Sequence, residues 1–230
     1  MKQGTILPVV ILTLLFAINA NAQVEYVSGM IVTDEATLIQ AADAWLSSRD
    51  AKEGQTTTLL SNMFNGASNE THTYVLNFPD YAALQRHMDK TETSPAFAKY
   101  VAIENLVSKG VSESLYLHAT DNGKEWKAGD YLFVVGINVN GPGPDYVAAM
   151  KELINSSLGK KAPGMMRLVA GRAGNDSSHA LIISAPSFAS LNEYLDSIPG
   201  NSDFEAFLSK VGDISSVTGT SMYRVVKVWK

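Results

Sequence analysis

Cysteine is absent from all 230 residues, and histidine occurs only four times. The missing thiol excludes disulfides, thiolate catalysis and cysteine-ligated metals. The four histidines form neither an H-E-x-x-H nor an H-x-x-E-H arrangement, so no metal site is predicted. Charge is also sparse: charged residues make up 18% of the chain, and the formal net charge is −5. Lysine and arginine are scattered rather than gathered in a basic stripe, so no nucleic-acid partner is expected.

Long apolar runs are missing except near the start of the sequence. The run from Ile6 to Ile18 follows Lys2 and precedes Ala20-Asn21-Ala22. This order is typical of a secretory signal peptide over residues 1–22, cleaved before Gln23. An uncleaved membrane anchor is the alternative, but the run is short for a span of roughly 20 residues. We therefore expect a periplasmic or secreted protein with no membrane span after signal cleavage.

The rest of the sequence repeats itself once. Residues 71–118 align with residues 178–225 at a constant offset of 107, without a gap. The matched positions include His72 with His179, Leu84 with Leu191, and Phe97 with Phe204. An internal repeat indicates that the chain folds as two similar structural units, independently of secondary-structure propensities. It predicts one repeat over residues 23–118, a polar linker over 119–129 and a second repeat over 130–230.

Each repeat has the pattern strand, helix, strand, strand, helix, strand. In the first repeat, strands are predicted at 26–33, 57–64, 72–78 and 112–118, and helices at 36–47 and from 79 onward with a break at 93–95. In the second, strands are predicted at 131–139, 165–171, 180–185 and 220–228, and the broken second helix at 188–215. This is the ferredoxin-like β-α-β-β-α-β arrangement, of the α+β class.

Both faces of the predicted strands are apolar. Tyr74, Leu76 and Phe78 lie on one side of the third strand and Val75 on the other. A sheet that is apolar on both faces must be covered on both. We therefore expect the two repeats to pack sheet to sheet with helices outward, as a pseudo-dimeric α+β barrel within one chain. Such a chain is expected to be a monomer, or a dimer formed through its helices rather than through the sheets.

One stretch of the first repeat resembles a known family. The run Asn77-Phe78-Pro79-Asp80-Tyr81-Ala82-Ala83-Leu84-Gln85-Arg86-His87-Met88, followed by Ser94-Pro95-Ala96-Phe97, is similar to the third-strand and second-helix signature of the antibiotic-biosynthesis-monooxygenase-like (ABM-like) family. The resemblance implies the dimeric α+β barrel fold. It leaves the chemistry open, because this superfamily includes cofactor-free oxygenases, haem degraders, decarboxylases and isomerases.

His87 is the candidate catalytic residue. It lies on the second helix beside the inward-facing positions, near the space that such folds enclose between sheet and helices. An imidazole there could deprotonate a phenolic or enolic substrate; a half-exposed helix histidine is the alternative. Trp45, inward on the first helix, could wall a pocket for a flat ligand or simply fill the core.

Further ligand-binding candidates are Tyr74, Asn77, Tyr116, Arg167 and Tyr194. Arg167 could hold a carboxylate bidentately, or face water from a strand edge. Tyr194 stands where the first repeat has His87, so any pocket should differ between the repeats. The matched pair His72 and His179 begins two equivalent strands, and a structural role is expected for both.

No cofactor is predicted. In haem-degrading relatives a histidine ligates the iron, and the resemblance places that position at Lys99 or Tyr100 here. Two functions remain open: an exported module that binds a small apolar or aromatic ligand or a protein partner, and a cofactor-independent monooxygenase-like enzyme acting on an aromatic or polyketide-like substrate in the first repeat.

Overall fold

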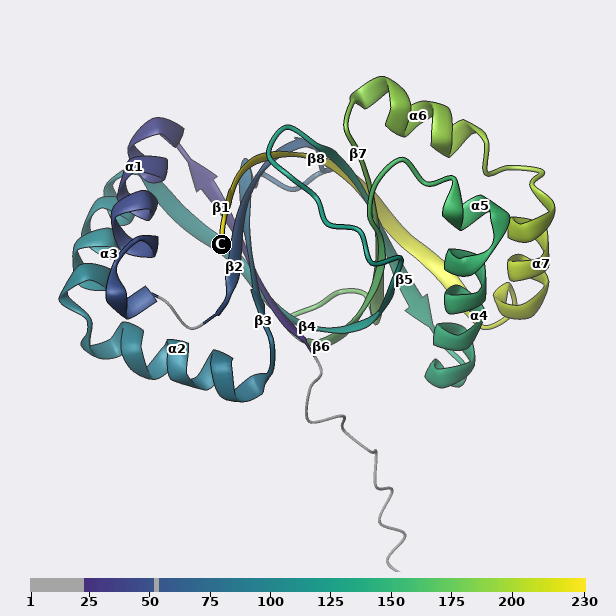
Figure 1. Ribbon diagram of the computed structural model, residues 1–230, viewed down its shortest axis with the longest axis horizontal. Coiled ribbons are helices and arrows are strands. Elements are labelled where there is room, and N and C mark those ends of the chain that lie inside the picture. The colour runs from purple at the N-terminus through teal and green to yellow at the C-terminus, as the bar shows by residue number, and fades with distance from the viewer. Residues whose placement is uncertain (1–22, 52–53) are drawn as a thin grey trace, which may run out of the picture.

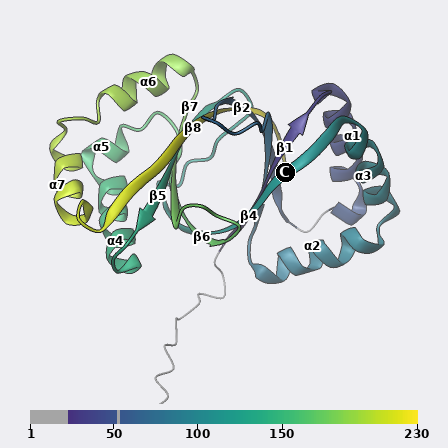
Figure 2. The same cartoon turned by 180° about the vertical axis from the view of Figure 1, so that it is seen from behind.

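Eight antiparallel strands close into one barrel, and helices cover it on two opposite sides (Figure 1). This computed structural model describes residues 23–51 and 54–230. The predicted signal peptide, residues 1–22, lies outside the described residues. The view from behind shows the same arrangement, with α1, α2 and α3 on one side and α4 to α7 on the other (Figure 2).

The first repeat contains four strands, three α-helices and a short 3-10 helix. Their bounds are β1 Val24–Val32, α1 Glu35–Leu46, η1 Arg49–Ala51, β2 Thr56–Phe64, β3 His72–Phe78, α2 Tyr81–Thr93, α3 Pro95–Val107 and β4 Ser108–Asp121. The second repeat follows the same order, with the short helix α5 where the first repeat has η1. Its elements are β5 Tyr131–Val139, α4 Gly143–Asn155, α5 Ser157–Lys160, β6 Met166–Ala173, β7 His179–Ala185, α6 Phe188–Asp196, α7 Ser202–Val211 and β8 Ser215–Trp229.

The strand order around the barrel is β1-β3-β2-β8-β5-β7-β6-β4. Within each repeat, the first strand lies between the third and the fourth, as in a ferredoxin-like sheet. The repeats join where the second strand of one pairs with the fourth strand of the other: Thr57 lies opposite Trp229, and Leu115 opposite Ala173. The predicted tandem α+β barrel is therefore confirmed.

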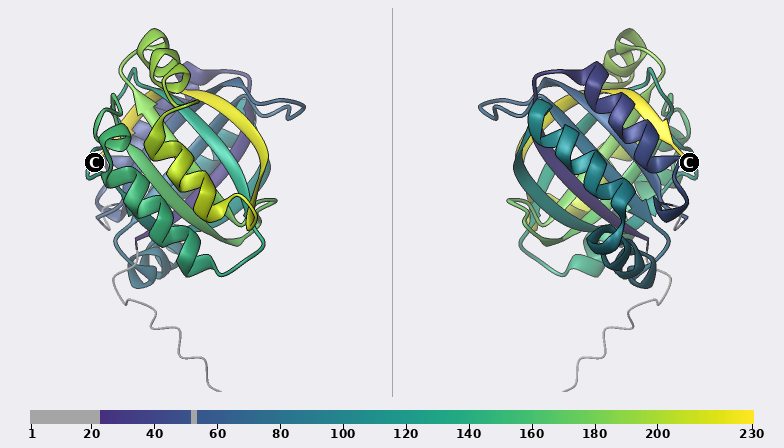
Figure 3. Two further views of the ribbon diagram at one scale, coloured as in Figure 1. Left: turned by 90° about the vertical axis from the view of Figure 1, so that its right-hand side faces the viewer. Right: turned by 90° about the vertical axis from the view of Figure 1, so that its left-hand side faces the viewer.

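Successive side chains of each strand point alternately to the helices and to the barrel interior. Tyr74 packs among the helix-facing residues of α1 and α3, whereas the adjacent Val75 belongs to the cluster inside the barrel. The interior also holds Trp126, whose indole nitrogen donates to Thr58 Oγ1 at 3.0 Å. The two apolar faces read from the sequence thus face two separate cores. Figure 3 shows the two helical layers face on, each covering one side of the barrel.

Serine and aspartate side chains cap the N-termini of several helices. Asp34 accepts from the backbone nitrogen of Thr37 and begins α1, as residues of this type at an N-cap do. The predicted break in the second helix occurs at Ser94, which ends α2 and caps α3. Among residues 23–51 and 54–230, no helix combines the length and apolarity needed to span a bilayer.

The structure differs from the prediction mainly in polar segments. The strands β4 and β8 begin four and five residues earlier than predicted, at Ser108 and Ser215. These extensions carry few apolar residues, so a hydrophobic pattern could not reveal them. They are held by backbone pairing with β1 and β5. At its other end β4 continues to Asp121, three residues into the predicted linker, and α5 was not predicted.

Candidate functional site

A cavity of about 320 Å³ lies in the first repeat, between the sheet and the helices α1 and α3. Its floor comes from alternate residues of β1 and β3, which point away from the barrel interior. Its sides include Trp45 of α1 and Phe97 of α3, and exposed residues at its rim, such as Glu113, connect it to solvent. We call it the α1 cavity.

One end of the α1 cavity carries hydroxyls and a carboxyl group. Tyr100 and Glu104 are one turn apart on α3, and the Tyr100 hydroxyl donates to Glu104 Oε1 at 2.9 Å. Tyr74 and Thr57 reach the same cavity from β3 and β2, and both are more than nine-tenths buried. Within the described residues, neither hydroxyl makes a hydrogen bond of standard geometry, although Tyr100 is close enough to influence the pKa of the Tyr74 hydroxyl. A buried polar group without a partner is costly, so these hydroxyls point to a ligand or water in the cavity.

Burial dominates the electrostatics of this polar end. It raises the pKa of the Glu104 carboxyl above its usual value, and the hydrogen bond from Tyr100 only partly opposes that effect. The pKa values of Tyr74 and Tyr100 are also raised, first by burial and then by neighbouring groups that include Glu104. The two phenols therefore remain protonated hydrogen-bond donors at neutral pH.

Part of the wall of the α1 cavity is aromatic. The ring of Trp45 makes an edge contact with Phe97, with centroids 5.1 Å apart. The His87 ring lies 6.4 Å from Trp45 and 5.2 Å from Phe78, and His87 lines the cavity. His87 is 9% exposed, so it is a buried residue of the wall rather than a half-exposed helix histidine. A flat molecule in the cavity, lying against Trp45 and Phe97, would be within reach of His87.

A second cavity, of about 510 Å³, adjoins the first beneath α2 and is called the α2 cavity here. Five residues line both cavities: Tyr26, Leu76, His87, Phe97 and Glu113. Most of the remaining wall is apolar. Ala173 and Gly174, from the β6–β7 hairpin of the second repeat, complete it.

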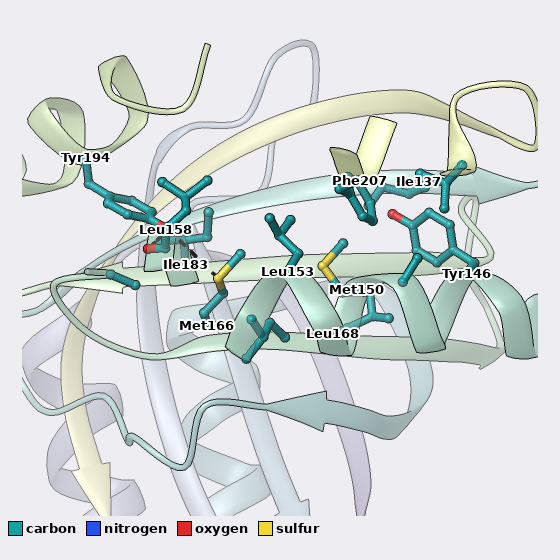
Figure 4. Close-up of a cluster of buried hydrophobic side chains, with 14 of the residues drawn as sticks. Ile137, Tyr146, Met150, Leu153, Leu158, Met166, Leu168, Ile183, Tyr194 and Phe207 are labelled. Carbon is teal, nitrogen blue, oxygen red and sulfur yellow. Dashed lines mark hydrogen bonds between the residues drawn. The ribbon is translucent and has the colours of Figure 1, made fainter. Parts of the chain in front are cut away.

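The equivalent region of the second repeat is a packed core (Figure 4). Ala42 of α1 corresponds to Met150 of α4, and His87 corresponds to Tyr194. Met150 is 1% exposed, and the Tyr194 hydroxyl donates to the carbonyl of Leu158 at 3.3 Å. At these two positions the second repeat has larger side chains than the first, whereas Leu153 stands where the first repeat has Trp45. The prediction that the pocket differs between the repeats agrees with this packing.

Arg167 lies in the barrel interior, so the expectation that it faces water is wrong. Its Nη1 donates to Glu25 Oε1 at 2.8 Å, and Nη2 lies 3.7 Å from Asp121 Oδ2. The guanidinium also lies over the Trp126 ring, 5.6 Å from its centroid. Asn77 Oδ1 is 3.4 Å from Nη1. The carboxylate that Arg167 contacts therefore belongs to the protein itself, and Asn77 belongs to this interior cluster.

The predicted binding residues fall in three places. Trp45, Tyr74 and His87 come together in the α1 cavity. Tyr116, like Asn77 and Arg167, points into the barrel, where it lines a cavity of about 100 Å³. Tyr194 is part of the packed core of the second repeat. The sequence prediction grouped these residues together, but successive residues of a strand point to opposite faces, so Tyr74 and Asn77 of β3 face different spaces.

Several residues of the α1 cavity were not predicted as binding residues. Tyr26 lies two residues before Ser28 on the helix-facing side of β1, and both line the cavity. Tyr100 and Glu104 are separated by four residues on α3. The sequence does indicate this pair, because it places a glutamate one turn after a tyrosine on an inward helix face. Thr57 carried no comparable signal.

The residues that could hold a cofactor or metal are few. In the described part of the chain, His, Asp and Glu side chains nowhere gather in groups of three that could hold a metal ion. At the position expected for a haem ligand, Lys99 is exposed and the Tyr100 hydroxyl is engaged by Glu104. These two residues do not fit haem ligation.

No protein-family model and no curated protein matches the sequence. Solved structures do resemble the fold over nearly the whole chain. A protein named provisionally as a monooxygenase, from Fusobacterium nucleatum subsp. nucleatum ATCC 25586, has a TM-score of 0.64 at 14% identity, covering 92% of this chain and 95% of that one. An anthrone oxidase-like protein has a TM-score of 0.58 at 13% identity, with coverages of 91% and 93%. A mutant chlorite dismutase from Candidatus Nitrospira defluvii has a TM-score of 0.53 at 8% identity, with coverages of 88% and 90%.

The fold is that of a dimeric α+β barrel. Here a single chain supplies both repeats of the barrel. The resemblance to the ABM-like family is thereby confirmed at the level of the fold. Because one fold hosts many unrelated activities, these likenesses do not assign the chemistry.

Proposed function

We propose that this protein binds a small hydroxylated aromatic molecule in the α1 cavity. The observation that carries the proposal is the open α1 cavity in the first repeat, where the second repeat has a packed core. Pockets for small molecules are typically apolar with a few placed polar groups. The Trp45 and Phe97 rings suit a flat ring system, and the unpartnered hydroxyls of Tyr74 and Thr57 suit its oxygen atom.

The test is to close the cavity with the residue that the second repeat already uses. Ala42→Met places a methionine where the equivalent position holds Met150. Binding of 2-naphthol, measured by isothermal titration calorimetry, should fall more than tenfold while the thermal unfolding temperature is maintained. Ala44→Met, on the exposed face of the same helix, is the matched control and should bind like the unaltered protein. Equal affinity in the Ala42→Met variant would place the binding elsewhere.

A second candidate is cofactor-independent oxygenation of a ligand in this cavity. The position of His87 between Trp45 and Phe78 favours it, because a buried imidazole against the ligand's face could accept a proton. The substrate would be an aromatic or polyketide-like molecule with an acidic ring methylene. One oxygen atom of O₂ would replace the two methylene hydrogens as a carbonyl, and the other would leave as water.

The His87→Phe variant separates the two candidates. If oxygenation occurs, the variant should retain ligand binding within a fewfold but lose oxygen uptake. Oxygen consumption should be followed with an electrode and anthrone as the probe. Turnover that is equal in His87→Phe and the unaltered protein would remove His87 as the base. Binding without any oxygen uptake in either protein would leave the binding function alone.

A further inference from the structure

We propose that the ligand has two parts, a hydroxylated ring held in the α1 cavity and an apolar substituent held in the α2 cavity. The inference rests on the proposed function and specifies its ligand class: a phenol or related hydroxyarene with an alkyl-like extension. It follows from the contrast between two adjoining cavities and from the residues they share.

The two cavities differ in chemistry. The α1 cavity ends in the Tyr100–Glu104 pair and two unpartnered hydroxyls, which suit a hydroxyl or carbonyl group. The wall of the α2 cavity includes Leu84, Phe78 and Leu115. An apolar substituent placed there would leave water, which is favourable in proportion to its apolar area. A ligand with one polar and one apolar end therefore matches the pair of cavities better than a compact ligand.

The shared residues connect the cavities. Tyr26, Leu76, His87, Phe97 and Glu113 line both. Three of them project from the strands β1, β3 and β4, and two from the helices α2 and α3. A ring seated in the α1 cavity against His87 and Phe97 would therefore direct a substituent past these side chains and beneath α2.

The second repeat supplies the far wall of the α2 cavity. The Ser114 hydroxyl donates to the carbonyl of Gly174 at 2.7 Å, and Asn175 Nδ2 donates to the carbonyl of Leu115 at 3.0 Å. Gly174 has a φ of +70°, and a Cβ there would collide with the carbonyl of Glu113. Glycine thus allows the β6–β7 hairpin to lie directly against β4, with Ala173 facing the cavity. The second repeat, whose own core is packed, thus contributes to the α2 cavity of the first repeat.

The test is a series of 4-alkylphenols, from 4-methylphenol to 4-hexylphenol, titrated calorimetrically into the unaltered protein. Each methylene that becomes fully buried should tighten binding by up to about fourfold. In Ala173→Arg, a charge at the cavity wall should abolish this increment but leave the affinity for 4-methylphenol within about twofold. Thr91→Arg, on the opposite wall in α2, should act in the same way.

The matched control is Asp176→Arg, which introduces the same side chain at an exposed position of the same hairpin that does not line the cavity. It should retain the full increment with chain length. No increment in the unaltered protein, or an undiminished increment in both arginine variants, would overturn the two-part ligand. If 2-naphthol and 4-methylphenol both fail to bind, the proposed function itself is wrong. If they bind and only the increment is missing, the failure belongs to this inference alone.

Discussion

The buried ion pair between Glu25 and Arg167 offers a sharp test of how the two repeats are held together. Glu25 belongs to β1 of the first repeat and is 1% exposed, and Arg167 belongs to β6 of the second. Replacing Glu25 with glutamine preserves its shape but removes the negative charge closest to the guanidinium. Asp121, 3.7 Å from Nη2, would remain as a neighbouring carboxylate, and Glu125 is also close enough for Arg167 to lower its pKa.

The expected cost follows from this geometry. Breaking one side of a buried pair typically costs 3–5 kcal/mol, because the remaining charge is left buried and uncompensated. Since Asp121 and the Trp126 ring still face Arg167, we expect the lower end, about 3 kcal/mol. The double variant Glu25→Met, Arg167→Met should be less destabilised than Glu25→Gln alone, because the buried guanidinium is removed and Asp121 keeps its contact with His118.

Equilibrium unfolding in urea measures these free energies. The loss in Glu25→Gln should be nearly the same at low and high salt, because a buried pair is weakly screened. Lys210→Ala is the control: it removes a pair with Glu152 whose side chains are 52% and 66% exposed, and it should cost well under about 1 kcal/mol. A loss below about 1 kcal/mol in Glu25→Gln, or a double variant at least as destabilised as Glu25→Gln, would refute the reasoning.

Two further predictions concern the cores of the repeats. Met150→Ala removes a side chain that is 1% exposed and should lower the free energy of unfolding by about 2–5 kcal/mol, as measured in urea; a loss below about 1 kcal/mol would mean that the second repeat is not tightly packed there. Glu104→Gln should stabilise the protein more at pH 7 than at pH 4. Because the pKa of Glu104 is raised in the folded state, the free energy of unfolding falls as the pH rises through that pKa. Glutamine does not ionise, so the variant escapes this loss of stability. Thermal unfolding at the two pH values checks the sign, and an effect independent of pH would contradict it.

The sequence predicted the architecture well because the architecture is repeated. The strands 72–78 and 131–139 were predicted at their observed bounds, since apolar residues and turns delimit them on both sides. The break at Ser94 was also predictable, because a proline follows it. The early residues of β4 and β8 were not, because their place in the sheet depends on backbone pairing with another strand rather than on their own side chains.

The site was only partly predictable. Trp45, Tyr74 and His87 come together in one cavity, but Arg167 and Asn77 belong to the barrel interior. Which face of a strand meets a cavity depends on the register with its neighbours, which one sequence does not reveal. Whether the cavity is open depends on the volumes of the side chains around it. Ala42 leaves space in the first repeat, whereas the equivalent Met150 fills it in the second. A hydrophobic pattern counts both residues as apolar and does not separate them.

Closure of the barrel constrains the order of folding. The strand β2 pairs with β3 nearby in the sequence, but its other edge pairs with β8, where Thr57 meets Trp229. Pairings this distant in sequence carry a loop-closure entropy that must be met before their contacts are gained, so they slow folding. Until β8 is in place, β2 and β5 each present an unpaired edge that can pair with another molecule. The pairing of β2 with β8 joins the two repeats within one chain. The nascent protein is therefore most prone to aggregation just before its last strand closes the barrel.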